Sequence, residues 1–406
     1  MVAAEAVDGL EETINPCVEG RRELPAAVEA AVMEKPGKIH TRKFPYPAVK
    51  RDSSLVRMVG SGLCGTDKHM FHGETVHPGG QDSTFPLIPG HENLAVIEKL
   101  GEKDGPWRDS NGAPLKVEDR VAVACDVNCG ECYNCRNFYG WCWCENVFGY
   151  GTTISCKDPP HLFGGWAEFM YLLPKVYMFK VPEGLPDRVA VLAEPMAVAY
   201  GSFARAMNPY WLAKEGAGPG DTVVVQGSGP LGLSHAAMAK MMGAGRVIVV
   251  GAPRERLELA RKMGADVTVD IGKFGTPEER VNEVRRLTEG RGAELVLECV
   301  GIPAAVSEGL EMVSMGGTYL TIGNYIDMGT VAINPQKQIL SRSLRIIGVN
   351  GMPYQAYGRG LRLMAQNWKR LSLDSFVTHE FTIDHAEDAL NMATSLKSLK
   401  VVVKPE

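Results

Sequence analysis

The sequence predicts an α/β protein in which a doubly wound parallel sheet is inserted into a second, mostly β domain. The chain has 406 residues, which is too long for one ordinary hydrophobic core and suits two domains. Between about residue 209 and residue 350, short apolar runs alternate with helical segments, as in a parallel sheet that helices cover on both faces. The segments on either side instead contain short β-branched runs broken by glycine and proline, so we expect them to fold together.

These patterns divide the chain into three parts. Residues 1–27 form a polar N-terminal extension, residues 28–208 and 351–406 form the mostly β domain, and residues 209–350 form the parallel-sheet domain. In the first domain the runs LVRMVGSGLCG, LAVIEKLG and RVAVAC predict strands joined by turns. Near the end of the chain we expect a helix over about 385–395 and then the strand KVVVKP, which returns to the first domain.

Composition and charge exclude several classes of protein. Hydrophobic residues make up 45% of the chain and charged residues 22%, as in globular proteins. The net charge is −5 and the basic residues are scattered, so we expect neither a nucleic-acid nor a membrane partner. No apolar run approaches the roughly 20 residues of a membrane-spanning helix. The N-terminus lacks the features of a secretory signal, and we therefore expect a cytoplasmic protein.

Six apolar runs predict the strands of the inserted sheet: residues 222–227, 247–251, 267–270, 295–301, 318–323 and 344–350. Helices are expected between several of them, over residues 256–263 and 303–315, and after a capping box at Thr276-Pro277-Glu278-Glu279. Six strands that alternate with helices make a complete doubly wound domain of the dinucleotide-binding type.

A glycine-rich turn directly follows the first of these strands. The motif GxGxxG opens a helix that Gly243 closes. Glycines allow a tight turn and close approach of the backbone, and the helix N-terminus presents free N–H groups to a pyrophosphate. The alternative is a purely structural turn, but the strand before it and the helix after it favour dinucleotide binding. The predicted contacts in this turn are Gly227, Gly229, Pro230, Leu231 and Gly232.

The second strand ends in Gly251, where NAD-specific enzymes usually have an acidic residue that binds the ribose 2′-hydroxyl. Nothing at this position would repel a 2′-phosphate, and Arg254 and Arg256 follow and could neutralise it. Alternatively, Arg256 packs on the adenine and Arg254 is solvated. The choice between NAD and NADP therefore stays open, with a slight preference for NADP. Val300 and Gly323, in the fourth and fifth runs, complete the predicted cofactor contacts.

Residues suited to zinc occur in two groups, of which the first is dispersed. It contains Cys64 and His69 in GLCGTDKH, His91 and Glu92 in PGHEN, and Glu194 in LAEPMAVA. Three such protein ligands and one open position make a catalytic zinc site. Taken alone, each residue also has a structural interpretation: Cys64 could be a small buried side chain, and Glu194 a carboxylate at a helix start.

The second group is compact. Seven of the ten cysteines lie within residues 125–156, and the spacing Cys129-x2-Cys132-x2-Cys135 lets consecutive thiolates wrap one ion. In a chain without an export signal this clustering favours metal over disulfides. Reduced thiols in a loop are the alternative. The fourth ligand of such a structural zinc is then Cys142 or Cys144.

Taken in order, these motifs resemble those of the zinc-dependent medium-chain dehydrogenase/reductase family, which includes alcohol, sorbitol, butanediol and threonine dehydrogenases. The family pattern G-x-C-G-[ST]-D-x-H is similar to residues 62–69, G-H-E to residues 90–92 and a glycine-rich stretch to residues 164–168, and the GxGxxG follows. The match runs from about residue 28 to the end. The resemblance implies a GroES-like catalytic domain with an inserted NAD(P)-binding Rossmann domain, one catalytic and one structural zinc, and a homodimer or homotetramer.

The resemblance also implies roles for the dispersed residues. Cys64 and His91 bind the catalytic zinc, and Glu92 either binds it or exchanges with water on the metal. Glu194 matches the LxEP pattern of the sorbitol-like branch, in which this glutamate holds either the zinc or its bound water. Glu194 therefore ranks below the other two as a ligand.

In the family, seven residues usually separate the third and fourth structural cysteines, which would place the fourth at Trp143. Cys142 lies one position short of it and Cys144 one position beyond. The following Glu145-Asn146 resembles the residues after the fourth ligand in relatives, so Cys144 is favoured.

The implied reaction transfers a hydride between a small alcohol and NAD(P), with a ketone or aldehyde as the oxidised product. Zinc favours ionisation of the alcohol at neutral pH. The proton leaves through the hydroxyl of Thr66, the cofactor ribose and His69, since histidine is the residue type that most readily exchanges protons near neutral pH. Glu194 favours secondary alcohols or polyols. The alternatives are a carbonyl reductase working mainly with NAD(P)H and a nucleotide-binding protein without catalysis. The candidate pocket residues are Phe71, Phe148 and Tyr150.

Overall fold

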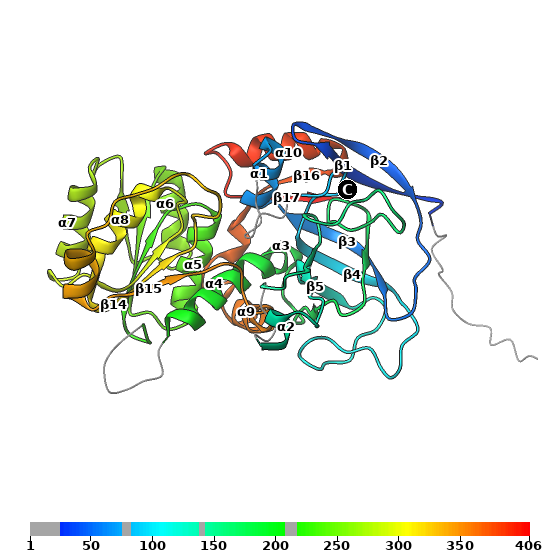
Figure 1. Ribbon diagram of the computed structural model, residues 1–406, viewed down its shortest axis with the longest axis horizontal. Coiled ribbons are helices and arrows are strands. Elements are labelled where there is room, and N and C mark those ends of the chain that lie inside the picture. The colour runs from blue at the N-terminus through cyan, green and yellow to red at the C-terminus, as the bar shows by residue number, and fades with distance from the viewer. Residues whose placement is uncertain (1–24, 75–82, 138–142, 208–216) are drawn as a thin grey trace, which may run out of the picture.

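The structure, a computed structural model, describes residues 25–74, 83–137, 143–207 and 217–406. The chain forms two halves that lie side by side, each built around its own β-sheet (Figure 1). Most of the predicted extension over residues 1–27 and the predicted boundary at 208–209 lie outside the described residues.

The first half contains a seven-stranded sheet in which strands from both ends of the chain meet. Its order is β16-β17-β3-β4-β5-β9, and β8 pairs with β3. In that order the strands span Val377–Thr382, Lys400–Lys404, Ser54–Gly62, Glu92–Leu100, Arg120–Val123 and Met178–Lys180, with β8 at Phe169–Leu172. β17 lies antiparallel to β3, with Val402 opposite Gly62, which confirms that the C-terminal segment returns to the first domain.

Shorter elements surround this sheet. The strands β1 (Ala27–Lys35) and β2 (Lys38–Pro45) form an antiparallel hairpin, and β6 (Asp126–Val127) pairs with β7 (Phe148–Gly149). The helices of this half are α1 (Gly65–His72), α2 (Tyr133–Asn137), α3 (Asp187–Ala190), α4 (Ala193–Ala206), α9 (Gln355–Asn367) and α10 (Ala386–Thr394). α10 and β17 agree with the helix and strand that the sequence predicts near the end of the chain.

The second half is a parallel six-stranded sheet in the order β12-β11-β10-β13-β14-β15. From β10 to β15 the strands span Thr222–Gln226, Arg246–Gly251, Val267–Asp270, Ala293–Glu298, Val313–Thr321 and Arg345–Gly348. The helices between them are α5 (Pro230–Met241), α6 (Arg254–Lys262), α7 (Pro277–Leu287) and α8 (Pro303–Met312). This order is that of a doubly wound dinucleotide-binding sheet, so the predicted fold class is confirmed.

Successive residues of β10 show why these strands are apolar throughout. Val223 and Val225 pack into the core that contains α4 and α5, whereas Val224 packs into the core on the other face, with Leu310 of α8. Side chains alternate across a strand, so a sheet that helices cover on both faces needs apolar residues at every position.

Two local predictions have different outcomes. The capping box is confirmed, because the Thr276 hydroxyl accepts a hydrogen bond from the Glu279 N–H at 3.2 Å and the Glu279 carboxylate accepts one from the Thr276 N–H at 2.9 Å. The predicted helix over residues 303–315 is wrong at its end. α8 stops at Met312, since the fully buried, β-branched Val313 begins β14 and pairs with Ala293.

The two halves share one hydrophobic core. α4 and α9 lie between the two sheets (Figure 1). This core contains Leu94 and Phe179 from the first half together with Val225 and Leu233 from the second. The continuous packing determines how the first turn of α4, which carries Glu194, faces the rest of the site.

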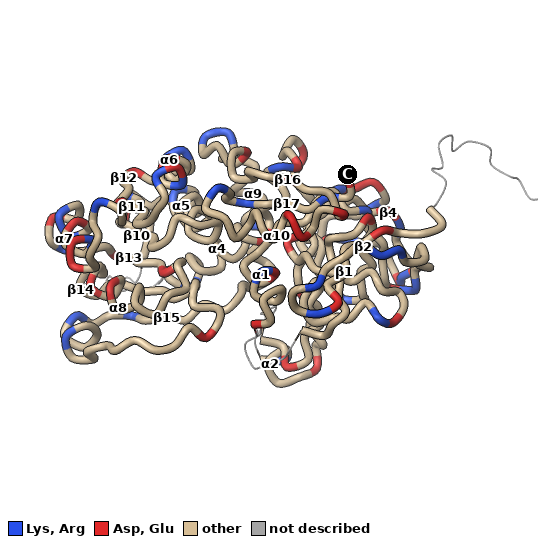
Figure 2. The backbone as a smooth tube through the Cα atoms, turned by 90° about the horizontal axis from the view of Figure 1, so that it is seen from above, with Lys and Arg blue, Asp and Glu red and all other residues tan. Residues whose placement is uncertain are grey.

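Charged residues of both signs are interspersed over the two halves (Figure 2). This distribution agrees with the scattered charge of the sequence. No helix within the described parts of the chain is long and apolar enough to span a bilayer.

Candidate active site

Cys64 and His91, the two predicted zinc ligands, lie around the buried carboxylate of Asp67. Cys64 follows β3 and caps α1, and its backbone N–H donates a hydrogen bond to Oδ2 of Asp67 at 2.8 Å. His91 immediately precedes β4, and its Nδ1 lies 3.6 Å from Oδ1 of Asp67. Both facing atoms are buried and lack a hydrogen-bond partner. Asp67 therefore orients His91 through Nδ1 and leaves Nε2 available to a metal, a role that the sequence analysis missed.

The electrostatics at His91 fit a cation-binding position. Burial lowers the pKa of His91, but the Asp67 carboxylate and the Cys64 thiol outweigh burial and hold this pKa well above its ordinary value of 6.5. Negative charge thus gathers at this point, and either an imidazole proton or a metal cation can balance it. A metal ion that binds here would replace protons on its ligands. Cys64 and His91 supply a thiol and an imidazole, which are ordinary zinc ligands, so the residues present fit a zinc ion.

Glu92 forms a buried ion pair that the sequence analysis did not anticipate. Both of its carboxylate oxygens lie within hydrogen-bonding distance of Nζ of Lys400, at 2.6 and 2.7 Å, and the same ammonium donates to the carbonyl of Leu63 at 3.1 Å. Lys400 is 2% exposed and Glu92 is 1% exposed. A direct bond from Glu92 to a metal would therefore have to compete with this pair. The lysine inside the apolar run KVVVKP was the signal for it.

Glu194 lies in the first turn of α4 and is almost fully buried. The pKa of Glu194 is raised to about 7: burial is the largest cause and the Glu92 carboxylate adds to it, whereas His91 and Lys400 act in the opposite direction. The Glu194 carboxylate is therefore sensitive to the charges of two other predicted ligands, Glu92 and His91. Cys64, His91, Glu92 and Glu194 thus interact electrostatically with a shared set of buried charges, but in the described part of the chain only the cysteine group has its ligand atoms all within 4.8 Å of one another.

Thr66 and His69 follow Cys64 on α1 but differ in exposure. Thr66 is buried, and its hydroxyl lies 3.7 Å from the thiol of Cys64. His69 is partly exposed, and its Nδ1 makes a short contact with a carboxylate oxygen of Glu74. One residue thus faces the buried ligands and the other reaches the surface. Glu74 is a partner that the sequence analysis missed.

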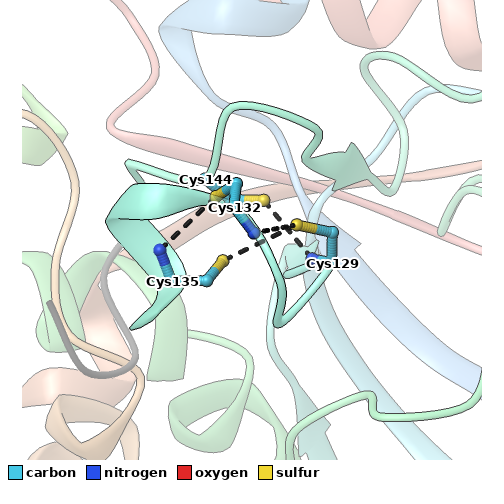
Figure 3. A group of neighbouring side chains, drawn as sticks. All are labelled: Cys129, Cys132, Cys135 and Cys144. Atoms are coloured by element: carbon cyan, nitrogen blue, oxygen red, sulfur yellow. Dashed lines mark hydrogen bonds between the residues drawn. The ribbon is translucent and has the colours of Figure 1, made fainter. Parts of the chain in front are cut away.

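The four cysteines of the compact group form a single cluster (Figure 3). The thiols of Cys129, Cys132, Cys135 and Cys144 all lie within 4.8 Å of one another. Backbone N–H groups point at them: that of Cys132 donates to the thiol of Cys129 at 3.4 Å, and that of Cys129 donates to the thiol of Cys144 at 3.3 Å. Four thiols at this spacing fit a closed, tetrahedral zinc site.

The environment of this cluster favours thiolates unequally. The backbone N–H groups of Glu131 and Cys132 lower the pKa of Cys129 to about 6, whereas burial is the largest cause that raises the pKa of Cys135 to about 12. Of the two candidates for the fourth ligand, Cys144 lies in the cluster and Cys142 lies outside the described residues.

The GxGxxG turn has the shape that a pyrophosphate needs. Gly227 has a φ of +105°, and a Cβ at Gly232 would collide with the carbonyl oxygen of Gly227, so both positions require glycine. Gly229 is the N-cap of α5, and a Cβ there would enter open space. Pro230 is the first residue of the helix and Leu231 the second. The helix N-terminus is therefore open to an anion.

Gly251 and the two arginines after it are not equivalent. A Cβ at Gly251 would lie 2.6 Å from Oγ and 2.8 Å from Cβ of Ser228, so an acidic side chain does not fit unless Ser228 moves. Arg254 is exposed and pairs with Glu258 at 3.0 Å. Arg256 instead donates to the carbonyls of Ser395 and Ser398 at 3.3 and 2.6 Å, so it joins the two halves.

Val300 and Gly323 lie on neighbouring loops that one buried carboxylate holds together. Oε1 of Glu298 accepts hydrogen bonds from the N–H groups of Val300 and Gly301, both at 2.7 Å. Oε2 accepts from the Gly323 N–H at 3.1 Å and from the Asn324 amide at 2.7 Å. Glu298 thus positions the loops after β13 and β14, and the sequence analysis missed this role.

The three candidate pocket residues lie in different settings. Tyr150 is fully buried in the first-domain core, and its hydroxyl accepts a hydrogen bond from the Leu173 N–H at 2.7 Å, so it is a core residue rather than a pocket residue. Phe148 lies in β7 and is 50% exposed. Phe71 packs at the edge of the same first-domain core.

Two family models match the chain. The model of the alcohol dehydrogenase GroES-like domain matches residues 50–183, and that of the zinc-binding dehydrogenase matches residues 230–366. The chain is 31% identical to 5-exo-hydroxycamphor dehydrogenase of Pseudomonas putida, over 92% of this chain and 98% of the relative. It is 29% identical to D-arabinitol dehydrogenase 1 of Uromyces fabae, over 94% and 98%.

Among solved structures, an alcohol dehydrogenase from Thermotoga maritima is similar with a TM-score of 0.84 and 31% identity, covering 94% of this chain and 100% of that one. A GroES-like domain joined to a zinc-binding dehydrogenase domain defines a class of metal-dependent oxidoreductases. The chain belongs to the zinc-dependent medium-chain dehydrogenase/reductase family. It is an enzyme of alcohol or polyol oxidoreduction that uses zinc and NAD(P), which confirms the predicted reaction class and cofactors.

Proposed function

We propose that the chain transfers a hydride reversibly from a small secondary alcohol or polyol to NAD(P)⁺, giving the ketone, NAD(P)H and a proton. The observation that carries this proposal is the position of the buried Asp67 carboxylate. It accepts a hydrogen bond from the backbone N–H of Cys64 and faces the ring of His91. Cys64 and His91 would hold the catalytic zinc. When bound, zinc supplies a Lewis acid for the alcohol oxygen, and the nicotinamide accepts the hydride.

Of the two glutamates, we assign contact with the metal or its water to Glu194. Both oxygens of Glu92 are engaged by Lys400. Glu194 forms no ion pair within the described part of the chain, lies in the first turn of α4, and has a pKa that the charges of Glu92 and His91 shift. The resemblance gives Glu92 two possible roles, binding zinc or exchanging with water on the metal. Because Lys400 engages both of its oxygens, we assign Glu92 the second role.

The chain's own proton path runs from Thr66 to His69. Thr66 is buried beside the Cys64 thiol and takes the proton from the substrate side. His69, which Glu74 orients, delivers a proton to solvent. Histidine suits this step because its ordinary pKa lies near neutral pH.

The direct test mixes protein of known zinc content with NAD or NADP and a panel of primary alcohols, secondary alcohols and polyols. We expect absorbance at 340 nm to rise with secondary alcohols or polyols, and the reverse reaction to consume NAD(P)H with the matching ketones. A preparation with two zinc ions per chain and bound coenzyme that oxidises none of these alcohols would reject the proposal. A rate detectable only in the NAD(P)H direction would favour the carbonyl reductase.

For the coenzyme we propose a preference for NADP over NAD. Ser228 occupies the space that an acidic side chain at position 251 would need, and Arg254, three residues after Gly251, is exposed. The ratio of kcat/KM for the two coenzymes measures the preference. A large preference for NAD would show that this argument is wrong.

We further propose that the enzyme is a cytoplasmic homodimer or homotetramer. β15 pairs with β14 on one side only and leaves its other edge open among the described residues, and Ile346 on it is 43% exposed. An unprotected edge strand is suited to pairing with a second copy. Analytical ultracentrifugation tests this, and a monomer at micromolar concentration would contradict it.

A further inference from the structure

Glu298, the last residue of β13, carries a buried negative charge that no cation among the described residues neutralises. Its side chain is 0% exposed. Its partners in the described part of the chain are uncharged donors: three backbone N–H groups, the side-chain amide of Asn324 and the hydroxyl of Thr321. Each oxygen accepts at least two of these hydrogen bonds and none of the partners requires a proton from it, so the group is an ionised carboxylate.

This charge lies at the carboxyl end of the parallel sheet, beside the reversal in strand order. β10 lies between β11 and β13, and the order runs in opposite directions on its two sides. A dinucleotide lies across such a switch point, with one mononucleotide over each half of the sheet. The GxGxxG turn and Gly251 follow β10 and β11, which leaves the half from β13 to β15 for the nicotinamide nucleotide. The predicted coenzyme contacts Val300 and Gly323 follow β13 and β14 in this half.

The loops after β13 and β14 are in direct backbone contact, with Glu298 behind them. A Cβ at Gly323 would lie 2.6 Å from the backbone nitrogen of Gly301, so no side chain fits between the loops. Val300 on the first loop is 43% exposed, although its N–H donates to the buried carboxylate at 2.7 Å. The loop thus has one surface open to a ligand and the Glu298 charge directly behind its backbone.

We propose that the Glu298 carboxylate acts through these loops on the nicotinamide ring and favours the oxidised coenzyme over the reduced one. The ring of NAD(P)⁺ carries a positive charge, and the ring of NAD(P)H carries none. A fixed negative charge inside the protein therefore stabilises the oxidised form selectively. Glu298 is a positioning residue, since it holds the loops and touches neither the ring nor the substrate. For the direction of reaction this inference rests on the proposed function: tighter NAD(P)⁺ and weaker NAD(P)H favour alcohol oxidation.

The test measures the dissociation constants of the zinc-loaded protein for NADP⁺ and NADPH, and for NAD⁺ and NADH, by calorimetry without substrate. Glu298→Gln removes the charge with little change in size. We expect it to weaken binding of the oxidised member of each pair about tenfold more than that of the reduced member, as for two unit charges on the order of 10 Å apart inside a protein. Equal weakening of both members would reduce Glu298 to a structural role and overturn the proposal.

Two further variants separate the charge from the position of the loops. Glu294→Gln removes a carboxylate at the other end of β13, where it accepts a hydrogen bond from the Thr222 N–H at 2.9 Å, and should leave the ratio of the two dissociation constants unchanged. Asn324→Ala removes one donor to Glu298 but keeps the charge, so it should weaken both coenzyme forms alike. A change of ratio in Glu294→Gln as large as that in Glu298→Gln would overturn the proposal.

A measurement on the wild type covers the case in which Glu298→Gln does not fold. Benzamide adenine dinucleotide resembles NAD⁺ in shape but has an uncharged ring. We expect the wild type to bind NAD⁺ more tightly than this analogue, and equal or tighter binding of the analogue would overturn the proposal. If the coenzyme ratio responds to Glu298→Gln as expected but the protein oxidises no alcohol, the role of Glu298 stands and only the proposed reaction falls.

Discussion

The two metal regions of this enzyme are built in opposite ways. The cysteine cluster takes all its thiols from one short segment of the chain, in and around α2, and they already lie within 4.8 Å of one another (Figure 3). The catalytic group draws Cys64, His91 and Glu194 from three separate segments. It depends on Asp67 and Lys400 to hold its charges in place. The ligands of a compact site are thus positioned by the local backbone conformation of one segment. The ligands of a dispersed site are positioned only when distant segments pack together.

The largest expected effect is the loss of activity when a ligand of the catalytic zinc is replaced. Cys64→Ser should remove one of two zinc ions per chain and lower kcat/KM by about 1,000-fold or more, because the metal contributes several kcal/mol to the transition state. The fold should persist, since the Cys64 cap uses the backbone N–H. Zinc analysis and steady-state kinetics measure both. Cys156→Ser, at a buried thiol outside both groups, is the control; activity of Cys64→Ser within tenfold of wild type would remove Cys64 from the ligands.

The second effect concerns the ion pair that supports the dispersed region. Lys400→Met leaves the Glu92 carboxylate buried and unpaired, so we expect the free energy of unfolding to fall by about 3–5 kcal/mol. Urea denaturation of the zinc-loaded protein measures this loss. The double variant Glu92→Gln/Lys400→Met removes both charges and should recover much of the stability. Equal loss in the single and double variants would show that the ion pair is not the cause.

The compact region should respond in stability more than in chemistry. Cys144→Ser should lose the other zinc ion and lower the free energy of unfolding by on the order of 3 kcal/mol, because a structural zinc contributes directly to folding. Its effect on kcat/KM should be smaller than that of Cys64→Ser. Cys142→Ser, the matched variant two residues away, should keep both zinc ions. Retention of both by Cys144→Ser would reverse the assignment of the fourth ligand.

The smallest expected effect is a pH-dependent loss of stability at His235, which joins the two halves of the chain. The dispersed site depends on this contact between the halves. His235 of α5 is fully buried, and its ring nitrogens lie 2.7 Å from the carbonyl of Leu231 and 3.0 Å from the hydroxyl of Ser202 on α4. Burial lowers the pKa of His235 to about 4. The unfolded chain, with a histidine pKa near 6.5, therefore binds this proton first. Stability that is present above that pH is lost as the pH falls towards 4.

We expect the free energy of unfolding to fall by about 2 kcal/mol between pH 7 and pH 5 because of this group. His235→Gln should show a correspondingly smaller loss over the same range. Urea denaturation at the two pH values measures the difference. The same acid sensitivity in both proteins would assign it to other groups, such as the carboxylates and thiols of the two metal regions.

Patterns that depend on neighbouring residues were predictable. The GxGxxG turn follows from strand, glycine and helix in direct succession, and a Cβ at Gly232 would indeed collide with Gly227. The three cysteines with two-residue spacings are close in sequence and meet within one short segment that includes the start of α2. The strands of the parallel sheet were visible because burial on both faces requires continuous apolar runs. The end of α8 was missed, because tertiary pairing of Val313 with Ala293 overrode the helical pattern.

The sequence by itself determined which residue types could bind zinc and a dinucleotide, since spacing and local period are properties of the chain alone. The tertiary structure decided which of those residues have competing partners. Lys400 meets Glu92 across 308 residues, Asp67 rather than Glu92 faces His91, and His235 of α5 meets Ser202 of α4. Such pairings depend on how distant segments pack around a shared core, and no local pattern encodes them.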